Sequence, residues 1–144
     1  MKPVLVLAAV AACVLGTVGS AAAQQEISLS AGFLPDPIYV DVYSGGSNEA
    51  YNISQSCVGS IADSPDVNVY FNSNGGRLAF GVYSQGDTSL VINGPDGRYY
   101  CNDDTNGLNP VLIWGNAPSG TYNIWVGAVG DGASATLVIT EGNP

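Results

Sequence analysis

The chain has 144 residues, with 12 acidic side chains against 3 lysines and arginines, and its formal net charge is −9 at pH 7. So acidic a protein is a poor partner for nucleic acids and anionic membranes. It contains no histidine, which excludes Ser-His-Asp and Cys-His catalysis and removes the commonest transition-metal ligand. Carboxylate chemistry remains, and we expect no enzymatic activity.

The N-terminal segment, 1–23, is typical of an export signal. Lys2 supplies a positive charge, an almost unbroken apolar run covers 3–19, and three alanines at 21–23 form a small-residue cleavage site. The run is short for a membrane span, and no later segment is as apolar. An alternative is a lipobox-like Val10-Ala11-Ala12-Cys13, which would place a lipid on Cys13. We therefore expect a secreted protein, extracellular or periplasmic.

Residues 24–144 suffice for one domain with its own core. Short runs of β-branched and aromatic residues alternate with Gly, Pro, Asn and Asp at a spacing of about 10 residues, which is typical of a sandwich or barrel. We predict an all-β fold, a jelly-roll-like antiparallel β-sandwich of about eight or nine strands, with no helix longer than a turn or two. The predicted strands are 26–30, 38–43, 67–71, 78–84, 89–93, 98–101, 111–114, 122–126 and 135–140.

Proline and glycine residues on either side of one strand set the start of the mature chain apart. A Pro35-Asp36-Pro37 elbow precedes the strand 38–43, and Ser44-Gly45-Gly46 follows it, so we divide the chain into an N-terminal strand and hinge, 24–46, and a β-sandwich domain, 47–144. The favoured interpretation pairs this strand within its own domain. The alternative donates it to a neighbouring copy, which would build an extracellular filament or another self-assembly.

With Cys13 set aside, two cysteines remain in the mature chain, Cys57 and Cys101. An even pair in an oxidising compartment predicts a disulfide between them.

The C-terminal two-thirds contains an ordered set of motifs: "GDTSLVI" at 86–92, "GPDG" at 94–97, "NDD" at 102–104, "NP" at 109–110 and "SGTYNIWVG" at 119–127. In this order, over about residues 57–141, the chain resembles the bacterial pre-peptidase C-terminal domain, a small β-sandwich often appended to secreted proteases. The resemblance implies a non-catalytic domain, of a family in which some members bind calcium or assist secretion and substrate attachment. No peptidase accompanies it here, which predicts a free-standing module.

Asn102-Asp103-Asp104, with Asp87 and Asn109, is the candidate metal site. Calcium takes six to eight oxygen ligands in irregular loops, and adjacent aspartates repel each other unless a cation lies between them. The family resemblance also points to calcium, which is the cofactor we predict. The alternative is an Asx turn, in which the same side chains bind backbone amides.

Five aromatic residues could form a platform for sugar rings: Tyr99, Tyr100, Trp114, Tyr122 and Trp125. Because they fall at alternating strand positions, we favour packing in or over the sandwich core. The predicted function is an exported, non-enzymatic, calcium-binding β-sandwich for adhesion or cell-surface association. Its partner would be a polysaccharide, a protein or other copies of itself.

Overall fold

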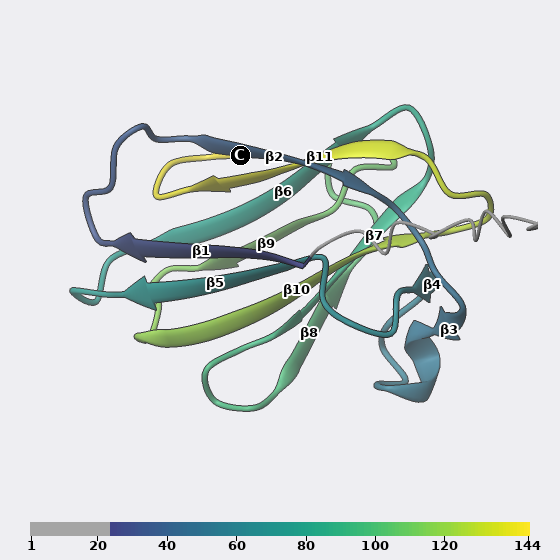
Figure 1. The fold of residues 1–144 in the computed structure, drawn as a ribbon, viewed down its shortest axis with the longest axis horizontal. Coiled ribbons are helices and arrows are strands. Elements are labelled where there is room, and N and C mark those ends of the chain that lie inside the picture. The colour runs from purple at the N-terminus through teal and green to yellow at the C-terminus, as the bar shows by residue number, and fades with distance from the viewer. Residues whose placement is uncertain (1–23) are drawn as a thin grey trace, which may run out of the picture.

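The computed structural model describes residues 24–144, and the predicted signal segment lies outside them. They form a β-sandwich of two packed sheets (Figure 1). The four-stranded sheet has the order β2 (Ile38–Tyr43), β11 (Ser134–Thr140), β6 (Leu78–Ser84) and β9 (Val111–Trp114). The seven-stranded sheet contains β1 (Gln25–Ser30), β3 (Asn48–Glu49), β4 (Ser60–Ile61), β5 (Val67–Asn72), β7 (Thr88–Asn93), β8 (Tyr99–Asn102) and β10 (Gly120–Ala128).

All nine predicted strands are present, with ends that differ by no more than two residues, and the all-β sandwich is confirmed. The strand count was too low. The prediction missed β3 and β4, which are two residues long and too short to show any alternation. A single turn of 3-10 helix, Ala50–Asn52, lies between them.

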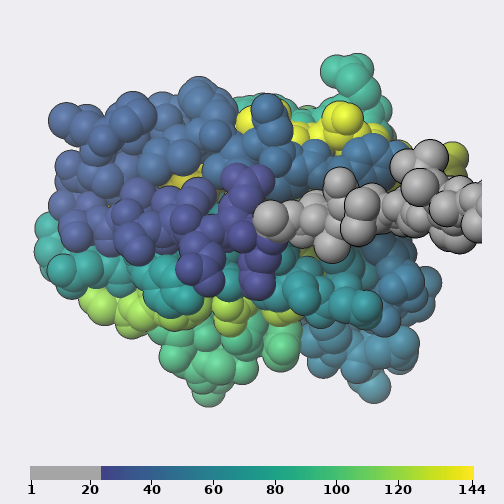
Figure 2. All heavy atoms as spheres, in the orientation of Figure 1, coloured from purple at the N-terminus to yellow at the C-terminus, as the bar shows by residue number. Residues whose placement is uncertain are grey.

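Purely antiparallel pairing was also wrong in one place, because β1 runs parallel to β5, with Gln25 opposite Val67 and Ser30 opposite Asn72. After β1 the chain crosses to the other sheet and becomes β2, which pairs antiparallel with β11. The strand 38–43 thus pairs within its own domain, as the favoured interpretation held. Figure 2 shows the residues of β1 on the surface of the sandwich, between the blue residues that follow them and the teal residues of β5.

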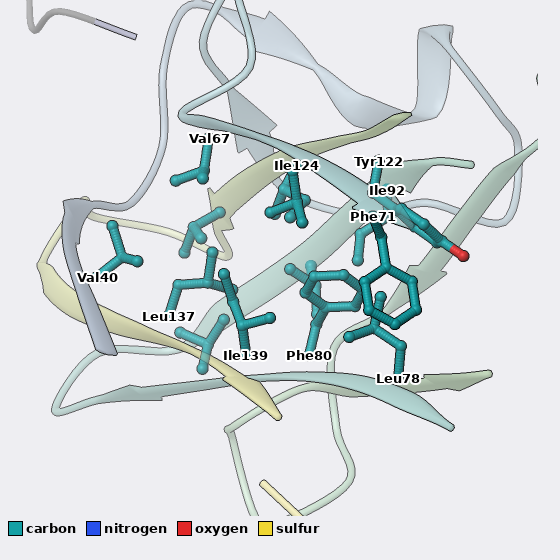
Figure 3. Close-up of a cluster of buried hydrophobic side chains, with 14 of the residues drawn as sticks. Val40, Val67, Phe71, Leu78, Phe80, Ile92, Tyr122, Ile124, Leu137 and Ile139 are labelled. Atoms are coloured by element: carbon teal, nitrogen blue, oxygen red, sulfur yellow. The ribbon is translucent and has the colours of Figure 1, made fainter. Parts of the chain in front are cut away.

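The main core lies between the sheets. It is built from the inward-facing residues of both, including Phe80, Leu137 and Ile139 from the four-stranded sheet and Tyr122 and Ile124 from β10. Figure 3 shows these side chains pointing toward one another from the two layers. Alternation along each strand explains their placement, since every second residue of a strand faces the same side.

The strand β10 organises the seven-stranded sheet. One of its edges pairs with β5 through Gly120–Ile124, and the other pairs with β7 through Asn123–Ala128. Beyond Ile124, β5 no longer pairs with the first edge of β10, and β4 pairs with the same edge at Ala128. In the gap between them, Gly45 N donates a hydrogen bond to Val126 O at 2.9 Å, so the link after β2 completes the sheet edge.

A second, smaller core covers part of the outer face of the seven-stranded sheet. We call residues 48–61 the cap, because their Ala50, Cys57 and Ile61 pack on Val91 and Trp125. The Cys57–Cys101 disulfide, with the two Cα atoms 5.2 Å apart, joins the cap to β8 and confirms the predicted pairing.

Candidate functional site

The predicted calcium residues lie around the loop between β8 and β9. Asn102 Oδ1 accepts hydrogen bonds from Thr105 Oγ1 at 2.7 Å and from Val111 N at 2.9 Å. Asn109 Oδ1 accepts one from Ser84 N at 3.2 Å. A carboxamide oxygen has two lone pairs, so the bonds to Asn102 occupy both. These two asparagines brace the loop against the neighbouring strands.

The acidic members of the predicted site are placed differently. Asp103 is half-buried and Asp104 is exposed, while Asp87 lies at the turn before β7, where its backbone oxygen accepts a bond from Val129 N at 3.0 Å. Within residues 24–144 no three acidic, histidine or cysteine side chains are grouped so that they could hold a metal ion. A calcium ion would therefore depend on Asp103 and Asp104 with backbone oxygens, and calcium binding stays a prediction.

The five candidate aromatic residues of the sequence analysis lie in or over the core, which agrees with the favoured interpretation. Tyr122 and Trp125 are buried, and Trp114 meets Tyr122 edge-on at 5.3 Å and Tyr100 at 5.1 Å between ring centroids. Burial raises the pKa of Tyr122 to about 12. Only Tyr99 is well exposed. These residues form no continuous platform for a ligand.

Hydrogen bonds to one carboxylate hold the hairpin that precedes this loop. Tyr100 OH donates to Asp96 Oδ2 at 2.6 Å, and Arg98 N donates to Asp96 Oδ1 at 3.1 Å. The tyrosine hydrogen bond, with the backbone bond, lowers the pKa of Asp96, and Asp96 raises the pKa of Tyr100. The contact links the turn to β8 and is structural.

A different set of tyrosines is exposed on the outer face of the four-stranded sheet. Tyr39 and Tyr43 on β2 are each 65% exposed, and Tyr83 on β6 is 48% exposed. Apolar and other residues alternate in Ile38–Tyr43, which places the two tyrosines of β2 on the face away from the apolar residues, but only the sheet order brings Tyr83 to the same surface. We call Tyr39, Tyr43 and Tyr83 the tyrosine face.

A groove crosses the tyrosine face. Asp41, Thr136 and Tyr83 are register partners on three adjacent strands, and Thr136 Oγ1 donates to Asp41 Oδ1 at 3.3 Å. They line a groove of about 630 Å³ together with Ser84, Gln85, Asn109 and Ser134. Val42 and Ala135 also line it, so the groove combines one aromatic ring and some aliphatic surface with hydroxyl, amide and carboxylate groups.

The groove continues around the edge of the sheet. A second hollow of about 540 Å³ shares Asp41, Val42 and Ser134 with the first and extends to Gln25 and Asp66. Tyr43 lies beside it and donates from its OH to Gly132 O at 3.0 Å, which fixes the position of the ring. The two hollows adjoin each other at these three shared residues, and we call them together the path.

The path has no positive charge in its lining. The chain after Lys2 contains two cationic side chains, Arg77 and Arg98. Arg77 donates to Gly142 O and Asn143 Oδ1, and Arg98 lies 4.0 Å from Asp96. An anionic ligand would thus meet Asp41 and Asp66 without a counter-charge, whereas a neutral ligand with many hydroxyl groups suits the lining.

The comparisons with known proteins show the fold. No protein-family model matches the sequence, and no curated protein matches it. The pre-peptidase C-terminal domain of collagenase from Bacillus anthracis superposes with a TM-score of 0.51 and 14% identity, over 81% of this chain and 94% of that one. The periplasmic inhibitor of g-type lysozyme, PliG, from Aeromonas hydrophila gives a TM-score of 0.45 and 10% identity, over 82% and 98% of the two chains.

The first of these likenesses confirms the resemblance to the pre-peptidase C-terminal fold that the ordered motifs indicated, and at 14% identity it shows the fold alone. The second is more distant still and carries no inference about this chain. Residues 24–144 contain no helix that is long and apolar enough to span a membrane.

Proposed function

We propose that this chain is an exported, non-enzymatic binding module that attaches to a neutral extracellular polysaccharide through its tyrosine face. The observation that carries the proposal is the path beside Tyr43 and Tyr83, with Asp41 and Thr136 in its floor. Aromatic rings offer apolar faces on which the C–H faces of sugar rings can lie, and the neighbouring polar groups can bind their hydroxyls. Adhesion or cell-surface association follows from such binding.

Two further observations support export and the neutral ligand. The disulfide Cys57–Cys101 suits an oxidising compartment. The strong negative charge keeps the protein from polyanions such as nucleic acids and anionic glycans. The likeness in fold to the pre-peptidase C-terminal domain of a collagenase is compatible with a non-enzymatic module.

The test is a binding assay with residues 24–144 on insoluble cellulose, xylan and chitin. We expect retention on at least one of them, and a roughly fivefold or greater loss of affinity for Tyr83→Ala, since one stacking ring contributes about 1 kcal/mol or more. Tyr51→Ala is the matched control, because Tyr51 is also exposed, at 58%, but lies on the cap. Equal losses in both variants, or no retention at all, would overturn the proposal.

An enzymatic alternative deserves a direct check because Asp41 and Asp66 line the same hollow and burial raises the pKa of Asp66 to about 6. A carboxyl with a raised pKa beside a second carboxylate is the arrangement of many glycosidases. Asp66, however, accepts a hydrogen bond from Val126 N in the sheet, which ties up one of its oxygens. We expect no release of reducing ends from any bound polysaccharide. Release that disappears in Asp66→Asn would establish an enzyme.

Self-assembly is the second candidate function. Its support is the position of β1, a six-residue strand at the edge of its sheet that pairs with β5 alone. A strand at such a position can be exchanged between copies. Light scattering of residues 24–144 and of 31–144 separates the two cases. Oligomers that depend on residues 24–30 would favour assembly, and a monomer in both would favour the binding module.

Calcium binding stays part of the proposal as a stabilising element of the loop after β8. Its support is the adjacency of Asp103 and Asp104, whose like charges repel at close range. The asparagine oxygens of this loop are engaged in hydrogen bonds to the protein. The expected ligands are therefore the two carboxylates and backbone carbonyls.

A further inference from the structure

Three asparagines form a row across the outer face of the seven-stranded sheet. Asn123 on β10 is the register partner of Asn93 on β7 and of Asn68 on β5. Their immediate neighbours along each strand, such as Ile92, Val67 and Ile124, point into the core, so the three carboxamides face outward together. Asparagine is depleted in strands, and three in register on adjacent strands call for a reason. We call them the amide row.

Hydrogen bonds order the amide row in one direction. Asn93 Nδ2 donates to Gly97 O at 3.0 Å, and Asn123 Nδ2 donates to Asn93 Oδ1 at 3.2 Å. At the other end, Asn68 Oδ1 is buried and has no hydrogen-bond partner among residues 24–144. A buried acceptor without a partner is destabilising, so the row ends at an oxygen that no donor of the described residues satisfies.

A buried donor without an acceptor lies nearby. Trp125 follows Asn123 by two residues on the same face of β10, and its indole Nε1 is also buried without a partner in the described part of the chain. Diagonal neighbours on adjacent strands are within reach of an aromatic side chain, and Trp125 is the diagonal neighbour of Asn68. Both atoms lie beneath the surface, so a ligand would meet the half-buried carboxamides of the amide row and not these two atoms.

The surroundings shape this strip into a site. A groove of about 350 Å³ adjoins the row and is lined by Tyr70, Thr121 and Ser28. These three are register partners of one another, and Tyr70 and Thr121 lie two residues along their strands from the asparagines of the row. Tyr70 is 43% exposed. At the other end, Tyr99 is opposite Asn93 and packs on Trp125 at 6.2 Å between ring centroids. Exposed rings thus flank the amide row on both sides.

We propose that the amide row and the groove beside it are a second binding site, for a neutral oligosaccharide. The chemistry of the row favours hydroxyl groups, which exchange hydrogen bonds with carboxamides in both directions. Glu26 is in register with Asn68 and disfavours an anionic ligand at that end of the row, while Arg98, whose backbone oxygen accepts a hydrogen bond from Asn93 Nδ2 at 3.4 Å, lies at the other end. The proposal shares only its ligand class with the proposed function, because the residues are different.

The position of this site has a consequence. The tyrosine face and the amide row lie on the outer surfaces of opposite sheets, so the core separates them. One molecule would bind two polysaccharide chains on opposite sides and join them. Linking of this kind explains adhesion better than a single site does, since two linked binding events raise the apparent affinity.

The experiment is a titration of residues 24–144 with cellohexaose, xylohexaose and chitohexaose. Side-chain NH₂ signals of Asn68 and Asn123 in ¹⁵N NMR spectra report on the amide row directly. We expect them to shift with one of the three sugars, and to shift equally in Tyr83→Ala, which affects the opposite face. Tyr70→Ala should weaken this binding about tenfold, while Tyr51→Ala on the cap should leave it unchanged.

The outcomes are distinguishable. Asparagine signals that stay unchanged with all three sugars, while Tyr83→Ala abolishes binding, would overturn the second site and keep the tyrosine face. Shifts that persist while Tyr83→Ala has no effect on any affinity would overturn the tyrosine face and keep the amide row. Asn123→Thr, which suits a strand, should give the same loss as Tyr70→Ala, and an unchanged affinity in both would also overturn this proposal.

Discussion

The carboxylate of Asp66 accepts a hydrogen bond from Val126 N at 2.8 Å, at the point where β5 has left the edge of β10 and β4 has not yet joined it. A side-chain oxygen thus stands where a neighbouring strand would supply a carbonyl. The position is largely buried, and burial outweighs the backbone hydrogen bond and raises the pKa of Asp66 to about 6. The contact therefore completes the sheet at the cost of a partly desolvated charge.

Asp66→Asn should stabilise the protein above pH 6. The wild-type carboxyl holds its proton up to about pH 6 in the folded state but only to its ordinary value of 3.8 when unfolded. Its contribution is thus complete below pH 3.8 and is lost as the pH rises toward 6. Asparagine keeps an acceptor for Val126 N and carries no charge, so we expect a gain of about 1–2 kcal/mol at pH 7, after allowance for solvent.

Urea unfolding at a series of pH values measures this difference. Asp131→Asn is the control, because it removes the same charge from an exposed loop. The difference between Asp66→Asn and the wild type should shrink as the pH falls from 6 to 4. A constant difference over that range would contradict the assignment of the raised pKa to Asp66.

Removal of the disulfide should destabilise the domain without changing its fold. The bond closes a loop with a sequence separation of 44 residues, for which loop entropy predicts roughly 3–4 kcal/mol. The double variant Cys57→Ala and Cys101→Ala should lower the free energy of unfolding by about that amount. Because the cap depends on this bond, its backbone amides should lose more hydrogen-exchange protection than those of β6 and β11. Uniform loss in all strands would argue against a locally held cap.

Gly46→Ala should be destabilising by about 1–3 kcal/mol. A Cβ at position 46 would meet the backbone of Ile61 and Ala62, and the backbone there is held by the bridge between β4 and β10. The link 44–46 is thus closely packed where the sequence indicated a hinge. Gly115→Ala is the control, since a Cβ there meets open space. Equal melting temperatures for the two variants would show that the segment yields easily.

Calcium should raise the melting temperature of residues 24–144, and EDTA should reverse the effect, because the ion would relieve the repulsion between Asp103 and Asp104. The double variant Asp103→Asn and Asp104→Asn should not respond to calcium. Asn102→Ala separates calcium binding from the bracing of the loop by Asn102. This variant removes the two hydrogen bonds to Asn102 Oδ1 whether or not calcium is present. A wild-type melting temperature that is the same in calcium and EDTA would remove calcium from the proposal.

The strands were predictable because alternation is local. In residues 38–43 the period of two identified both the strand and its apolar face, and Tyr39 and Tyr43 lie outside as that pattern requires. By contrast, β3 and β4 have two residues each, and their pairing depends on an edge of β10 that local sequence does not describe. The parallel partnership of β1 with β5 likewise depends on where the chain crosses between the sheets.

The candidate sites were likewise predictable from the sequence only in part. Asn102 and Asn109 were identified from residue type, but their oxygens bond to Val111 N and Ser84 N, which only the fold brings near. Tyr83 gave no functional signal in the sequence, since an alternating tyrosine in a strand is usual. Its significance comes from its register with Thr136 and, through it, with Asp41.

By itself, the sequence determined the β class, the positions of the main strands, the pairing of Cys57 with Cys101 and the absence of imidazole chemistry, because each depends on composition or on a short repeat. The tertiary structure decided which strands are neighbours, and thereby which polar groups meet. Sheet order and register are set by packing between residues far apart in the chain, as for Asp66 and Val126 or Asn68 and Asn123. The tyrosine face and the amide row exist only at that level.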